Sequence, residues 1–449
     1  MATFAAALGD SLPVLIQCGT DTDIGGGREN QDDFFVHASA GVVIFCVLDG
    51  HGREVGKVAA NTARAALIEY FTTYCPALAV AEDCRVAAYE CLVRAHNIAH
   101  AAIKIAFRAE MEKQGFEVEE TEGGYLRKRR GSTANWTCIH GGSSCSIIMI
   151  LKNKCYIANV GDSTGILCGY HKALKQTLVL PLGDAAKGGL TRVSENGHGN
   201  VAALGQGIDT VLLTAEHSPE CPEEFKRLRD FRCNEDDRRF PSLSVVYDSQ
   251  TSNRADCPPV FRLDEHGEPR VLDHGCYYKN VRKEWASLVA TPNTAQFQDA
   301  LAFTRSLGDL HLHTYGVTHE PQLQWFDLDS VWSDLKAGNT SMQTLGNTSA
   351  DNLAPDIAEA LFCIVLATDG VWDNWAYEEV TRFVMHSSCI GAVMQSSDGA
   401  QRVAQSFMQR NAVYAKRNFG NQADNATGIV AYVGRPDSNL FTSSIVNSV

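Results

Sequence analysis

The stretch VVIFCVLDGHG, Val42–Gly52, is an apolar run that ends in an aspartate followed by a glycine. A short apolar run bounded by turn residues predicts a buried β-strand. Two other runs share this form, CYIANVGDS at Cys155–Ser163 and LFCIVLATDGVWD at Leu361–Asp373, and Asp424 precedes a further apolar run. Carboxylates at strand ends, beside glycines that let other groups approach the backbone, are typical of sites for hard cations. The pattern therefore predicts a pocket that holds two or more divalent metal ions.

Composition narrows the class of protein. The 449 residues are 45% hydrophobic and carry a formal net charge of -14, which argues against a nucleic-acid-binding surface. No apolar stretch approaches the roughly 20 residues needed to cross a bilayer, so we expect no membrane span. The N-terminal segment lacks the basic and apolar regions of a secretory signal. The fifteen cysteines form no CxxC pair, which favours a reducing compartment.

We therefore expect a cytoplasmic and/or nuclear location. The basic run Arg127–Arg130 leaves a nuclear-localisation interpretation open.

The periodicity of apolar residues predicts paired helices and hairpin-like strands. Strands are predicted at Asp33–His37, Val42–Leu48, 143–150, 155–160, Leu361–Ala367 and Gly428–Val433, and helices at Glu54–Tyr74, Arg85–Lys113, Glu378–His386 and Gln401–Lys416. This order favours antiparallel sheets with helices packed outside rather than alternating β-α units.

The candidate acids run from residue 32 to residue 424, so both ends of the chain must meet in one domain. We predict a single domain over 15–435, with terminal tails at 1–14 and 436–449. Long polar stretches without clear periodicity are predicted to be insertions, at about 109–131, 170–208 and 230–290.

Seven motifs occur in a fixed order along the chain: GRENQDDFF, VLDGHG, ANVGDS, LTAEHSP, LAFTRSLGD, LATDGVWD and DNATG. In this order they resemble the metal-dependent PPM-type (type 2C) serine/threonine protein phosphatases. The resemblance implies an α+β fold, a four-layer αββα sandwich in which two mainly antiparallel sheets are flanked by helices. It also implies a dinuclear metal site in the cleft at one edge.

The family's chemistry is the hydrolysis of phosphoserine and phosphothreonine in proteins by a metal-bridging water or hydroxide. A pair of cations activates water and neutralises developing charge, so the resemblance implies two Mn²⁺ or Mg²⁺ ions. Asp49 is the candidate bridge between them, with the carbonyl of Gly50 as a further ligand. Asp369 and Asp424 would complete one metal shell. A single strand-end aspartate is often only a turn former or helix cap, but the ordered set favours metal ligands.

A weaker third metal is implied by Asp162 and Asp373, which match acids that hold such an ion in many relatives. Ser144 stands where the family has a small hydroxyl residue near that site. Asp373 also has a second interpretation, as the N-cap of the following helix.

His51 follows the candidate bridge and by resemblance is the general acid that protonates the leaving alkoxide, a role that suits imidazole. Arg28 is the candidate phosphate ligand, because a guanidinium holds phosphate through parallel hydrogen bonds. Its spacing leaves two registers for the nearby outer-shell acid, and we favour Asp32, with Asp33 second. Arg53 replaces a glycine common in the family and is expected to tune substrate charge preference.

Two other pairs of residues are candidates for catalysis, and the sequence argues against both. Asp309 and Arg305 lie in a motif that looks structural in the family, so we place both outside the catalytic core. Cys221 and Arg227 have the spacing of cysteine-dependent phosphatases. The intervening PEEFK has no glycine to turn amides toward phosphate, and its acids would repel phosphate.

The sequence thus predicts a monomeric enzyme that acts on phosphoproteins. The alternative is a catalytically silent PPM-fold protein that binds metal and serves as a regulator or scaffold. The two long insertions motivate this alternative, because they could cover the cleft or dock a partner.

Overall fold

The computed structural model describes residues 14–169, 209–215, 217–231, 242–249, 251, 253–333, 335–336, 357 and 360–435. Two five-stranded antiparallel sheets form its framework. The first runs β1 (Leu15–Asp23), β21 (Ala426–Gly434), β20 (Leu361–Ala367), β11 (Thr164–Gly169) and β12 (Asp209–Leu212). The second runs β19 (Gln322–Asp327), β10 (Lys154–Val160), β9 (Cys145–Leu151), β3 (Val42–Leu48) and β2 (Asp33–Ser39).

Strand β3 shows why the central strands are apolar throughout. Successive side chains of a strand point to opposite faces of the sheet. Val43 and Phe45 face the core between the two sheets, whereas Ile44 and Cys46 face a second core under the helices. Both faces of β3 are therefore buried, and all of its residues are inaccessible to solvent.

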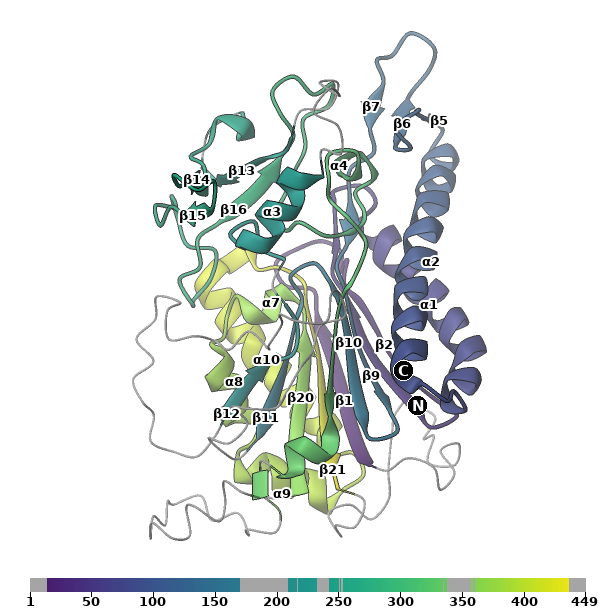
Figure 1. The fold of residues 1–449 in the computed structure, drawn as a ribbon, viewed down its shortest axis with the longest axis vertical. Helices are drawn as coiled ribbons and strands as arrows, with labels where there is room; N and C mark the ends of the chain where they lie inside the picture. The colour runs from purple at the N-terminus through teal and green to yellow at the C-terminus, as the bar shows by residue number, and fades with distance from the viewer. Residues whose placement is uncertain are drawn as a thin grey trace.

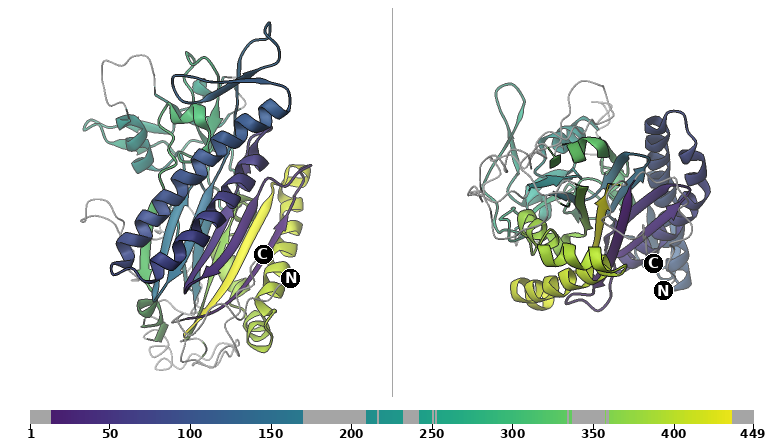
Figure 2. Two further views of the ribbon diagram at one scale, coloured as in Figure 1. Left: turned by 90° about the vertical axis from the view of Figure 1, so that its right-hand side faces the viewer. Right: turned by 90° about the horizontal axis from the view of Figure 1, so that it is seen from below.

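Helices cover the outer faces of both sheets (Figures 1 and 2). The second sheet packs against α1 (Gly56–Ala79) and α2 (Cys84–Lys113). The first sheet packs against α8 (Tyr377–Val384), α9 (Ser387–Gln395) and α10 (Gly399–Phe419). This arrangement confirms the predicted four-layer αββα sandwich.

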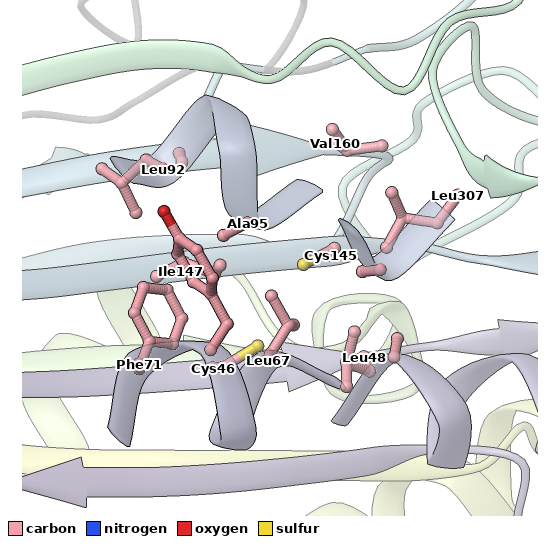
Figure 3. Close-up of a cluster of buried hydrophobic side chains, with 14 of the residues drawn as sticks. Cys46, Leu48, Leu67, Phe71, Leu92, Ala95, Cys145, Ile147, Val160 and Leu307 are labelled. Atoms are coloured by element: carbon pink, nitrogen blue, oxygen red, sulfur yellow. The ribbon is translucent and has the colours of Figure 1, made fainter. Parts of the chain in front are cut away.

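The apolar face of α1 explains its position. Ala59, Ala63, Leu67 and Phe71 recur every fourth residue and are fully buried, so they form one stripe along the helix. Figure 3 shows Leu67 and Phe71 beside strand residues such as Cys46.

Two elaborations extend this sandwich. Beyond α2, the strands β5 (Glu117–Glu120), β6 (Leu126–Arg129) and β7 (Thr137–Cys138) form a small sheet. Two of its basic residues are ion-paired, Arg127 with Glu119 at 3.0 Å and Arg129 with Glu117 at 2.7 Å.

The second elaboration lies above the ends of the sheets in Figure 1 and has its own apolar core. It comprises α3 (Pro222–Asp230), β13 (Ser244–Tyr247), β14 (Phe261–Leu263), β15 (Pro269–Val271), β16 (Ser287–Ala290), β17 (Ala300–Leu301) and α4 (Leu310–His313). Leu228, Tyr247, Val289 and Leu312 belong to that core. The described residues of the insertion predicted at 230–290 are thus part of a larger folded unit. The one predicted at 170–208 lies outside the described residues.

Every cysteine in the described part of the chain is a free thiol. Within the same residues, no helix combines the length and apolar character that crossing a membrane requires.

Candidate metal centre

Acids from both sheets meet at one edge of the sandwich. Asp49 follows β3 and Asp162 follows β10 in the second sheet, while Asp369 follows β20 in the first and begins α7 (Asp369–Trp372). One carboxylate oxygen from each of these three residues lies within 4.8 Å of the other two. All three side chains are half-buried, so the group faces a partly open edge.

Asp32, rather than Asp33, joins these acids. Asp32 is 8% exposed, and its Oδ2 accepts a hydrogen bond of 2.8 Å from Thr368, the residue before Asp369. Asp33 instead lies 3.4 Å from the guanidinium of Arg64 on α1. Neighbouring side chains of an extended chain point to opposite sides, which explains why only one of the two can reach the site.

The carboxylates of this site raise one another's pKa values. Partial burial and then the neighbouring carboxylates raise the pKa of Asp49 and of Asp369 well above the ordinary value. Burial and the charge of Asp424, opposed by hydrogen bonds from two threonines, raise the pKa of Asp32 to about 7. These shifts mean that the carboxylates repel one another when all are ionised.

Three carboxylate oxygens in the site are buried without a hydrogen-bond partner among the described residues: Oδ1 of Asp32, Asp162 and Asp369. An unpaired buried carboxylate is costly unless a cation or donor compensates it. Carboxylate oxygens are the ligands that Mg²⁺ prefers in proteins, and Mn²⁺ also suits them. The residues therefore fit divalent cations of this kind.

Glycines beside the acids permit close backbone approach. A Cβ on Gly50 would lie 2.4 Å from the carbonyl oxygen of Gly56, and one on Gly370 would lie 1.9 Å from that of Asn425. Both distances are below van der Waals contact, so any larger residue would displace the chain that carries the site.

Ser144 holds the backbone of Asp49 through a pair of hydrogen bonds. Its N–H donates to the Asp49 carbonyl oxygen at 2.8 Å, and its Oγ accepts from the Asp49 N–H at 3.1 Å. The hydroxyl also lies 2.7 Å from Oγ of Ser163. Ser144 is fully buried, so its visible contribution is to fix the position of Asp49.

Asn425 joins the two ends of the domain. Its Oδ1 accepts from the Gln31 N–H at 2.7 Å, and its Nδ2 donates to the Ile24 carbonyl oxygen at 2.8 Å. The loop between Ile24 and Gln31 carries Arg28, so Asn425 holds both ends of that loop. Asp424, the residue before Asn425, has an exposed side chain. Arg28 and Arg53 are also exposed and make no hydrogen bond or ion pair with the described residues.

Asp373 lies where the second elaboration touches the sandwich. The Val281 N–H donates to its carbonyl oxygen at 3.1 Å. Burial raises the pKa of Asp373 and of Asp162, while the ammonium of Lys279 opposes the shift at both. The interpretation of Asp373 as a helix N-cap is wrong: it is the C-cap of α7, and Ala376 is the N-cap of α8.

His51 has a carboxylate partner that the sequence did not reveal. Strands β4 (Gly50–His51) and β18 (Leu307–Gly308) both pair with β8 (Gly142–Ser143). The residue after β18 is Asp309, and its Oδ2 lies 2.6 Å from Nε2 of His51.

The His51–Asp309 pair is charge-balanced. Burial alone would lower the pKa of His51, but the charge of Asp309 and the hydrogen bond outweigh it and raise that pKa. His51 Nδ1 is buried and has no hydrogen-bond partner among the described residues. Asp309 adopts a left-handed backbone conformation with φ of 40°, which costs energy for a non-glycine residue and is frequent at functional sites.

Arg305 is anchored in a buried ion-pair cluster on the second elaboration. Its Nη2 lies 2.5 Å from Oε1 of Glu224, and Nη2 of Arg227 lies 2.8 Å from the other oxygen of that carboxylate. Arg227 also donates to the Thr304 carbonyl oxygen at 2.9 Å. These contacts occupy Arg227 and give it no role as a phosphate ligand for Cys221, which begins α3.

Fold and site together define an αββα sandwich with a cluster of carboxylates at one edge. Residues 87–178 match the sequence profile of the family described as protein phosphatase 2C. A serine-threonine phosphatase 2C from Toxoplasma gondii has a similar structure, with a TM-score of 0.52 and 13% identity over 96% of this chain and 99% of that chain. The family match and the fold confirm the resemblance to the type 2C protein phosphatases.

Two more distant structures are also similar. A C. elegans sex determining protein has a TM-score of 0.46 and 14% identity, covering 93% of this chain and 65% of that chain. The catalytic domain of the serine threonine protein phosphatase PstP, in complex with two manganese ions, has a TM-score of 0.40 and 14% identity. It covers 94% of this chain and 99% of that chain. No curated protein sequence matches the chain.

Proposed function

We propose that this protein is a metal-dependent phosphatase that hydrolyses phosphoserine and phosphothreonine in proteins. The observation that carries the proposal is the set of carboxylate oxygens without a partner among the described residues, close in the chain to His51 and its partner Asp309, because Asp49 and His51 both follow β3. The family match supports the same activity.

The proposed ligands for two Mn²⁺ or Mg²⁺ ions are Asp49, the Gly50 carbonyl, Asp369 and Asp424, with Asp32 in the outer shell. When bound, such ions supply Lewis acidity and lower the pKa of water to the range in which it is a nucleophile. Asp162 and Asp373 are proposed to hold a weaker third ion.

The chain's own residues supply the remaining chemistry. His51 donates a proton from Nδ1 to the leaving serine or threonine oxygen, while its Nε2–H stays bonded to Asp309. Because Asp309 raises the pKa of His51, more of the imidazole carries the required proton near neutral pH. Asp309 is thus a positioning residue.

Arg28 and Arg53 are proposed to bind the phosphoprotein. Both are exposed cations beside the site, and neither is neutralised by a described residue. A guanidinium can hold the substrate phosphate through two parallel hydrogen bonds, which suits Arg28. Arg53, next to the turn that carries His51, is proposed to favour acidic residues near the phosphorylated site.

The test is phosphate release from a phosphothreonine peptide after EDTA treatment and after Mn²⁺ is added back. The proposal expects activity only with metal, and loss of that activity in Asp369→Asn. Wild-type rates in a folded Asp369→Asn protein would overturn it. A folded wild-type protein that binds Mn²⁺ without turnover would favour the silent regulatory alternative.

A further inference from the structure

Three histidines outside the acidic site converge near the second elaboration. His100 lies on α2, His313 ends α4, and His319 precedes β19. One ring nitrogen from each lies within 4.8 Å of the other two. We propose that these residues form a separate binding site for an imidazole-preferring divalent cation, of which Zn²⁺ is the representative.

Hydrogen bonds prepare two of the rings for a metal. His313 Nε2 lies 3.0 Å from the Ser306 carbonyl oxygen, and His319 Nε2 lies 3.1 Å from Oδ1 of Asn97. Carbonyl-type acceptors require an N–H on Nε2, so the lone pair of each neutral ring is on Nδ1. His319 Nδ1 is buried without a hydrogen-bond partner among the described residues. Metal-binding histidines usually donate their other N–H to such an acceptor.

Metal binding to the third ring, that of His100, would break a hydrogen bond within the protein. The Gly308 N–H donates to Nδ1 of His100 at 3.1 Å. A neutral imidazole has only one nitrogen with a free lone pair, so a cation bound to His100 displaces Gly308. All three rings are stacked: the interplanar angle is 8° for His100 and His319, whose centroids are 4.0 Å apart, 28° for His100 and His313 at 4.6 Å, and 20° for His313 and His319 at 5.5 Å. Since a metal lies in the plane of its imidazole ligand, binding must also tilt these rings apart.

The protonation of the rings favours a cation. Burial lowers the pKa of His100 to about 2 and that of His313 to about 4. Both rings are therefore neutral at physiological pH, as metal ligation requires. All three proposed ligands are imidazoles, which suit Zn²⁺, Cu²⁺ or Ni²⁺, whereas the oxygen ligands of the other site suit Mg²⁺ and Mn²⁺. The side chains are partly exposed, which leaves a fourth position for water.

The experiment measures Zn²⁺ binding to the full chain by competition with a chromophoric chelator, in excess Mg²⁺ to fill the acidic site. X-ray absorption then identifies the ligands. We expect nitrogen ligands at about 2.0–2.1 Å and at least about tenfold weaker binding in His319→Gln and in His313→Gln. The exposed His266 provides the matched control, His266→Gln, which should bind as wild type does.

Unchanged affinity in folded His319→Gln and His313→Gln would overturn the site, as would sulfur ligands at about 2.3 Å. Thermal unfolding identifies a variant that fails to fold, and the other variant then provides the result. Asp369→Asn separates this proposal from the phosphatase, because it should lose phosphate release and keep Zn²⁺ binding in Mg²⁺.

Discussion

Ionisable groups gather in two partly or fully buried regions of the protein, which differ in whether their charges are paired. Around Glu224, two guanidiniums lie within 2.8 Å of one carboxylate, so the cluster is neutralised from within. Around Asp49, several carboxylates meet, and three of their oxygens have no hydrogen-bond partner in the described part of the chain.

The pKa shifts express the difference. Although burial opposes the change, Arg305 and Arg227 hold the pKa of Glu224 well below its ordinary value. Partial burial and like charges drive the pKa of Asp49 well above its ordinary value. A paired cluster stabilises the metal-free fold, whereas an unpaired one weakens it and creates a demand for cations. Charge balance therefore separates a structural group from a ligand site more reliably than burial does.

The largest effect is expected from Asp49→Asn. Loss of the proposed bridging ligand should lower phosphate release by about 10³-fold or more, because metal ions supply several kcal/mol to such reactions. The same change should raise the melting temperature in EDTA, since it removes one repelling charge. Thermal unfolding with and without Mn²⁺ measures this. Asp230→Asn, at an exposed position, should change neither quantity. Lower stability of Asp49→Asn in EDTA would contradict the comparison.

Glu224→Gln should destabilise the fold by about 3 kcal/mol, because it leaves buried cations without their partner. The folded pKa of Glu224 is depressed, so its stabilisation is fully present above the ordinary value of 4.5. It is lost as the pH falls toward the lower folded value. Denaturant unfolding at pH 7 and at pH 3 should therefore show a smaller difference between variant and wild type in acid. The exposed neighbour offers the control, Glu223→Gln, and equal stability of the two variants would refute the prediction.

Asp309→Asn tests the contact between Asp309 and His51. It should lower turnover of a phosphoserine peptide by about 10- to 100-fold, part of what a general acid contributes. The pKa of His51 should fall, so activity should decline at a lower pH on the alkaline side. Turnover of p-nitrophenyl phosphate, whose leaving group needs no proton, should suffer less. A uniform loss on both substrates would indicate a structural role alone.

The smallest effect is expected from Lys279→Met. Lys279 is one of the cations near Asp162 and Asp373, and of these it opposes the rise in the pKa of both acids most strongly. Removing a partly exposed charge changes such interactions by up to about 1 kcal/mol. Mn²⁺ should therefore bind about two- to fivefold more tightly to the acidic site, as measured by calorimetry. Lys283→Met should leave the affinity as it is, and weaker binding in Lys279→Met would show that the lysine acts otherwise.

Local patterns predict the parts of the fold that are buried on both faces. The bounds of β3 and β20 coincide with the predicted strands, because glycine and aspartate interrupt the apolar runs there. Strand β1 was not predicted. Its sequence, LIQCGTDTD, mixes polar residues and glycine, and it is a strand because it pairs along its whole length with β21.

The residues of the candidate site could likewise be predicted only in part from the sequence. The motifs predict which acids belong to the site. The choice between Asp32 and Asp33, however, depends on which side chain faces Thr368 and which faces Arg64. Asp309 lies 258 residues from His51, and only the pairing of β4 and β18 with β8 brings them together. The roles of all these residues in metal binding and catalysis remain predictions.

The pairing of β1 with β21 also constrains when the first sheet can be completed. Leu15 lies opposite Gly434, and Asp23 lies opposite Ala426, so β1 cannot complete its ladder until β21 has been synthesised. Contacts this distant in sequence form slowly, because they close a very large loop. Asp424 and Asn425 belong to the same late segment. The ladder between β1 and β21, which Asp424 and Asn425 directly precede, can therefore be completed only after residue 434 has been synthesised.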